Sequence, residues 1–121
     1  MGRQDKLMTP PYVNRVHLQG VVSSHPILKA LTATTNFTTF EVSLVESWAN
    51  ADGAHRARKN RVVVEVVGRD SAMALARARV GAWVTIEGYI RSEIFKGETL
   101  MKVRTLTIDV WEEPVGHRPS S

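Results

Sequence analysis

The chain has 121 residues, no cysteine and a formal net charge of +4 at pH 7, with 43% hydrophobic and 23% charged residues. This length allows one domain with one hydrophobic core, and the lack of cysteine excludes disulfides and thiolate metal sites and fits a reducing cytoplasm, the localisation we expect. No apolar stretch reaches the ~18 residues that a membrane-spanning helix needs, and the excess of positive charge favours an anionic partner.

Two alternating strands are predicted in the first half of the chain, after an N-terminal arm. Residues 1–11 end near "TPP", which resists helix formation, and are expected to be flexible. Apolar and polar side chains alternate in residues 13–22, "VNRVHLQGVV", and again in residues 40–48, "FEVSLVESW", as in half-buried strands. Trp48 ends the second strand, outside its apolar phase. Residues 23–39 are expected to form a long polar connection between the two strands.

A cationic loop and a third strand follow. Residues 49–60, "ANADGAHRARKN", predict a turn-rich loop, because Asp52-Gly53 is a strong hairpin signal. The β-branched run "RVVVEVVG" at 61–68 predicts a strand. The loop would therefore join Trp48 directly to this strand.

The second half of the chain predicts one helix and two further strands, at residues 70–79, 80–95 and 99–111. Asp70 or Ser71 can cap the helix, and "KGE" at 96–98 is a tight turn between the two strands. The polar tail at 112–121, "EEPVGHRPSS", is expected to be disordered.

The predicted order is β-β-β-α-β-β, with the helix between the third and fourth strands. Five short strands with one helix in that position are typical of the OB-fold, a five-stranded Greek-key barrel. We therefore expect an all-β OB-fold domain at residues 12–111, between a flexible arm and a disordered tail.

Several stretches, taken in order, resemble the bacterial single-stranded DNA-binding protein (SSB) family and the related primosomal replication protein N. These stretches are "VNRVHLQGVV", "FEVSLVESW" and "VVVEVVGRDSAMALARARVGAWVTIEGYIRSEIF". The resemblance covers roughly residues 13–110, nearly the whole predicted domain. It implies a non-enzymatic protein that binds single-stranded DNA by stacking bases on aromatic side chains, with Lys and Arg beside the backbone.

The resemblance assigns stacking roles to two aromatic residues. Trp48 falls on the tryptophan of the family's E-S-W pattern, and Phe95 falls where the family places an aromatic between its last two strands. Two further stacking positions of the family are occupied here by Arg61 and Val67. A guanidinium plane can still stack on a base, whereas a valine cannot.

Basic residues are the candidate phosphate contacts. The loop cations share a hairpin with Trp48, and Lys102 and Arg104 lie in the same strand phase as Leu106 and Ile108, so part of that face is expected to leave the core and become cationic. A solvated loop is the alternative interpretation of the charge run. The full set of candidates is Arg61, Arg56, Arg58, Lys59, Lys102, Arg104, Arg91, Arg15, Lys29 and Lys96.

Nothing in the sequence indicates catalysis, a metal or a cofactor. The four histidines lack metal-ligand spacing, and there is no P-loop or nucleophile motif. Glu65 and Glu87 sit on different predicted strands, where paired carboxylates are more often salt-bridged than catalytic.

We therefore expect sequence-tolerant single-stranded DNA binding and protection in DNA replication, repair or recombination. The resemblance implies a homo-oligomer, a tetramer if SSB-like or a dimer if similar to primosomal protein N. The chain ends without the acidic Pro-Phe tip of the SSB family, so recruitment of replication proteins is not expected by that route. Three alternatives stay open: an adaptor in replication restart, a protein–protein module and an RNA-binding OB domain.

Overall fold

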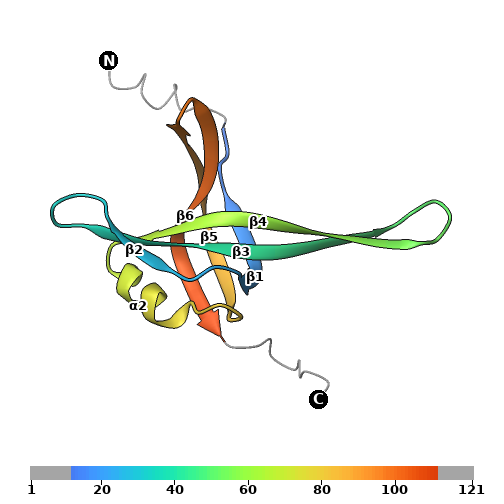
Figure 1. Ribbon diagram of the computed structural model, residues 1–121, viewed down its shortest axis with the longest axis horizontal. Coiled ribbons are helices and arrows are strands. Elements are labelled where there is room, and N and C mark those ends of the chain that lie inside the picture. The colour runs from blue at the N-terminus through green and yellow to red at the C-terminus, as the bar shows by residue number, and fades with distance from the viewer. Residues whose placement is uncertain (1–11, 112–121) are drawn as a thin grey trace, which may run out of the picture.

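A computed structural model of the chain describes residues 12–111, and the expected N-terminal arm and C-terminal tail lie outside this range (Figure 1). No helix in the described part is long and apolar enough to cross a membrane. The elements in chain order are β1 (Val16–Val22), β2 (Ile27–Ala30), β3 (Asn36–Ala49), β4 (His55–Val67), α2 (Asp70–Arg77), β5 (Trp83–Phe95) and β6 (Glu98–Trp111).

Five of the strands close into a barrel. They pair in the order β1-β5-β6-β4-β3, and a short antiparallel pairing of β1 with β3 completes the ring. The β4–β6 pairing is parallel, whereas the other pairings are antiparallel. With α2 between the third and fourth barrel strands, this arrangement confirms the expected OB-fold.

The core lies inside the barrel and is built from alternate residues of the strands. Buried side chains repeat at every second position, as a strand with one face inward requires. They include Val22, Phe40, Val42, Val64, Val66, Val84, Ile86 and Val103. Ala74 of helix α2 and its C-cap residue Ala78 join the same core. The hydroxyl of Thr38 on β3 holds the helix against the barrel by donating to the Ser71 carbonyl at 2.7 Å.

Two expected loops contain strand residues. The polar connection at 23–39 contains β2, which pairs with the start of β3 and lies outside the ring. Its threonines are β-branched and favour extended backbone even though they are polar. The predicted extent of the loop at 49–60 was also wrong, because β4 begins at His55 and the turn itself is confined to residues 50–54.

The helix is shorter and capped differently from the prediction. It ends at Arg77, whose guanidinium donates to the Val110 carbonyl at 3.0 Å. Arg69 occupies the N-cap position without a side-chain cap, and Ser71 instead donates to the Gly68 carbonyl at 2.7 Å. The expectation that Asp70 or Ser71 caps the helix was therefore wrong.

An irregularity in the β5–β6 pairing changes which way the β6 side chains point. Glu87 is paired with Thr107, whereas the next residue of β5, Gly88, is paired with Thr105, so Leu106 is an extra residue on β6. Such a bulge reverses the alternation of side chains along the strand. The predicted single phase through Lys102, Arg104, Leu106 and Ile108 was therefore wrong. Val103 and Ile108 pack on the core side, and the two cations lie on the outer face.

Candidate nucleic-acid interface

Two long β-hairpins project from the barrel in different directions (Figure 1). The first, the β3–β4 arm, is paired without a break from Phe37↔Val67 to Ala49↔His55. The second, the β5–β6 hairpin, ends in the pair Phe95↔Glu98 around a two-residue turn. Because each hairpin extends beyond the hydrophobic core, both faces of its outer half are exposed to solvent.

Trp48 sits near the end of the β3–β4 arm beside two arginines. The residue is 43% exposed, Arg56 is its direct cross-strand partner, and the Arg58 guanidinium carbon lies 5.9 Å from the centre of its ring. Glu46 accepts a hydrogen bond from Arg58 at 3.2 Å and another from Asn60 at 3.0 Å. These hydrogen bonds, Asn60 first and Arg58 second, hold the pKa of Glu46 below its usual value. The carboxylate therefore stays charged and keeps Arg58 against the ring.

The faces of the arm separate its cations into two groups. Direct cross-strand partners in an antiparallel pair lie on the same face. Trp48 therefore shares a face with Arg56 and Arg58, and Lys59 and Arg61 lie on the opposite face. The unbroken register also puts Trp48 in phase with the core residue Phe40, contrary to the sequence prediction, and its exposure comes from lying beyond the core.

Phe95 ends the second hairpin and is 55% exposed. Its neighbour Lys96 adopts a left-handed backbone (φ 53°), as does Gly97 (φ 80°), which is the geometry of a tight two-residue hairpin turn. The Lys96 ammonium lies 5.3 Å from the centre of the Phe95 ring. Each of the two hairpins therefore presents an exposed aromatic ring next to a cation.

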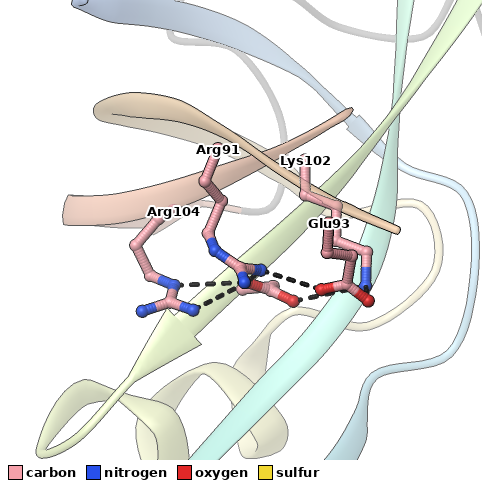
Figure 2. Close-up of polar contacts among 5 residues, drawn as sticks. Arg91, Glu93, Lys102 and Arg104 are labelled. Atoms are coloured by element: carbon pink, nitrogen blue, oxygen red, sulfur yellow. Dashed lines mark hydrogen bonds and ion pairs between the residues drawn. The ribbon is translucent and has the colours of Figure 1, made fainter. Parts of the chain in front are cut away.

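Three of the predicted phosphate contacts meet at a buried carboxylate on the outer face of the barrel (Figure 2). Glu65 of β4 is only 2% exposed. Its Oε1 accepts hydrogen bonds from Arg91 at 3.0 Å and from Arg104 at 3.1 and 3.2 Å, and its Oε2 lies 3.5 Å from the Lys102 ammonium. We call these residues, together with Glu93, the Glu65 cluster.

Glu93 joins the Glu65 cluster from its solvent side. One of its oxygens accepts from Arg91 at 3.1 Å and the other accepts from Lys102 at 3.0 Å. The hydrogen bond from Lys102, followed by that from Arg91, lowers the pKa of Glu93, so it is ionised at neutral pH. Three positive charges against two negative ones leave the cluster with a net charge of +1.

A pocket of about 300 Å³ opens between the bases of the two hairpins. Its walls are apolar and come from four barrel strands, whereas Arg61 and Lys102 supply its positive charge. The apolar lining residues are Val16, Leu18, Val62, Ile90, Met101 and Val103. A pocket of this kind suits a flat, apolar group that carries a negative charge at one edge.

The remaining predicted residues lie elsewhere. Arg15 is exposed immediately before β1 and lines a separate pocket of about 630 Å³ with Tyr89, and Lys29 is exposed on β2. Val67 is half-buried at the end of β4. No group of three or more His, Cys, Asp or Glu residues within 12–111 is placed to hold a metal ion.

Sequence reasoning missed the roles of Glu65 and Glu93. It identified the cations by charge and considered Glu65 only beside Glu87. The available signal was the placement of charges at alternate positions, opposite in sign in "RSE" of β5 and both positive in "KVR" of β6. Pairing of these strands places Arg91 opposite Lys102. Like charges directly opposite one another are destabilising. The pairing of Arg91 with Lys102 therefore indicates that a carboxylate lies nearby to neutralise them.

The chain is similar to a known protein family and to proteins of known structure. The sequence profile of the single-strand binding protein family matches residues 13–113. No curated protein sequence matches the chain.

The fold is similar to those of solved single-stranded DNA-binding proteins. A deletion variant of the protein from Thermus aquaticus matches with a TM-score of 0.74 and 18% identity, over 83% of this chain and 51% of that one. The wild-type Thermus aquaticus protein gives 0.71 and 18%, over 83% and 50% of the two chains. A Plasmodium falciparum SSB in complex with ssDNA gives 0.73 and 16%, over 85% and 96%. The chain thus spans about half the length of the Thermus proteins.

Proposed function

The chain belongs to the single-strand binding protein family, and from that premise we propose that it binds single-stranded DNA without a chemical step. The observation that carries the proposal is the exposed pairing of an aromatic ring with a cation on each of two projecting hairpins. Stacking platforms beside positive charge are what binding of unpaired strands requires, because the bases and the phosphates are both accessible.

Trp48 is the main proposed stacking platform. Arg56 and Arg58 share its face, so a base on the indole would have its phosphate within reach of a guanidinium. Stacking of a base on an aromatic side chain contributes ~1–3 kcal/mol. Phe95 with Lys96 offers a second, smaller platform on the other hairpin.

The pocket between the hairpins provides a path from one platform to the other. Its apolar walls suit a base, and Arg61 and Lys102 are placed to contact the phosphate of the same nucleotide. Lys59, on the same face of the arm as Arg61, would extend this line of positive charge. Arg15 and Arg104 remain further proposed contacts.

The proposed binding is sequence-tolerant. Every base has a stackable face, and contacts to phosphates carry no sequence information. Such binding would serve the protection of unwound strands during DNA replication, repair or recombination.

The substrate class is tested by competition. Unlabelled oligo-dT is expected to displace a labelled oligo-dT at least tenfold more effectively than duplex DNA of equal length, because duplex bases are not free to stack. The matched RNA oligomer tests the alternative RNA-binding function. Preferred displacement by RNA or by the duplex would contradict the proposal.

We also propose that the chain forms a homo-oligomer, as the family resemblance implies, with a tetramer favoured over a dimer. Light scattering is expected to give four times the chain mass of 13.5 kDa. Twice that mass would support the dimer, and a mass equal to that of one chain would overturn the proposal.

A further inference from the structure

We propose that Arg91, Lys102 and Arg104 form a binding site for one phosphate of the bound strand, and that Glu93 occupies this site in the free protein. This inference rests on the proposed function and deepens it. Glu65 would be a positioning residue that holds the cations together, and Glu93 an internal competitor that the DNA phosphate displaces.

The positions of the two carboxylates suggest these different roles. The side chain of Glu65 is 3% exposed and accepts three hydrogen bonds from two arginines. The side chain of Glu93 is 35% exposed and is held by one bond from Arg91 and one from Lys102. Removing Glu65 from its partners would leave a buried charge unpaired, which is costly. Glu93 can rotate away from its partners into water at little cost, because an exposed ion pair contributes little to the free energy of folding.

Glu93 already shows how a phosphate would bind. Its two oxygens accept separately from the Arg91 guanidinium and the Lys102 ammonium, as two oxygens of a phosphodiester can. Within residues 12–111, both carboxylate contacts of Arg91 are made through Nη1, so Nη2 can donate to a further acceptor. In the same part of the chain Arg104 contacts Glu65 through Nε and Nη2, so Nη1 can do likewise.

The surroundings favour a phosphate within a nucleic-acid strand over a free anion. Lys59 and Arg61 precede Glu65 on β4 at alternate positions, so all three lie on one face of the strand. Alternate side chains of a strand are about 7 Å apart, which gives a line of positive charge that leads to the Glu65 cluster. Lys102 also lines the apolar pocket together with Arg61, so the cluster adjoins the proposed path of the bases.

The test is the affinity of the full chain for oligo-dT over a range of salt concentrations in Glu93→Gln. Glu87→Gln is the matched control, because Glu87 is an exposed carboxylate on the same strand. We expect Glu93→Gln to bind about three- to tenfold more tightly than wild type at low salt, and the control to stay within about twofold. The plot of log K against log salt concentration is expected to keep the slope of wild type, because the phosphate occupies the site in both complexes and the same number of phosphates is neutralised.

Glu65→Gln separates positioning from charge. It removes the same negative charge, so charge alone predicts tighter binding, whereas loss of positioning predicts binding about three- to tenfold weaker with a shallower salt dependence. Tighter binding by this variant would overturn the role of Glu65. A thermal melt checks that the Glu65→Gln variant is folded. If Glu65→Gln does not fold, Glu93→Gln still tests the phosphate site.

The outcomes distinguish the inference from the proposed function. If wild type binds but Glu93→Gln is no tighter than Glu87→Gln, the phosphate site is overturned and the proposed function stands. If neither wild type nor any variant binds oligo-dT at low salt, the proposed function fails and the phosphate site fails with it.

Discussion

Replacing Trp48 with alanine is expected to weaken oligo-dT binding about 5- to 150-fold, the equivalent of losing ~1–3 kcal/mol of base stacking. The loss is expected to be large because Arg61 and Val67 occupy two positions where the family resemblance places aromatics. Arg58 would also lose the ring that it lies over. Affinity is measured by the fluorescence anisotropy of a labelled oligo-dT, at one salt concentration for all variants.

Two variants serve as controls for this substitution. Trp48→Phe keeps an aromatic face and is expected to recover most of the affinity. Trp83→Phe removes a tryptophan whose ring stacks on Trp111, with the ring centres 5.8 Å apart, at the opposite end of β5 from Phe95. It is expected to bind as wild type does. Trp48→Ala binding within twofold of wild type would refute the stacking role.

Gly88→Ala is expected to lower the free energy of unfolding by about 2–4 kcal/mol, because the new methyl group has no room. An added Cβ would lie 2.1 Å from the carbonyl oxygen of Arg104 and 3.1 Å from the Cα of Thr105, and both are backbone atoms. The strands would have to separate next to the bulge at Leu106. Urea unfolding at matched protein concentration measures the change.

Gly53→Ala is the comparison for Gly88→Ala. Gly53 has a φ of 89° in the turn of the β3–β4 arm, and an added Cβ would meet nothing within 4 Å. Only backbone strain is then introduced, at about 1 kcal/mol. Equal losses of stability in the two variants would contradict the close approach of β5 and β6 at Gly88.

The barrel could be predicted from the sequence because its strands follow simple physical rules. Phe40 and Val42 repeat at alternate positions and lie in the core, as the alternation at 40–48 predicts. The β-branched run at 61–68 predicts a strand, and its Val64 and Val66 also lie in the core. The short helix could be predicted from the alanine, leucine and methionine residues that fill it, although its cap was predicted wrongly. The turns at Asp52-Gly53 and at Lys96-Gly97 were likewise predicted from their glycines, which supply positive φ angles.

The β3–β4 arm and the Glu65 cluster could not be predicted, because both depend on pairing between residues that are distant in the sequence. Residues 55–60 are polar and resemble a loop, and they are extended only because β3 pairs with them. The bulge at Leu106 has no local signature, yet it decides that Lys102 and Arg104 face outward beside Glu65. Charge and composition identified the candidate cations, but not the carboxylates that hold three of them.

The competition assay, repeated with wild-type protein and oligo-dT at increasing salt concentrations, tests the central claim most directly. We predict tight binding at low salt and a linear fall of log K with log salt concentration, with about 0.7 in slope for each phosphate contacted. Duplex DNA is expected to compete poorly throughout. Absence of oligo-dT binding at low salt, or binding that salt does not weaken, would contradict the account.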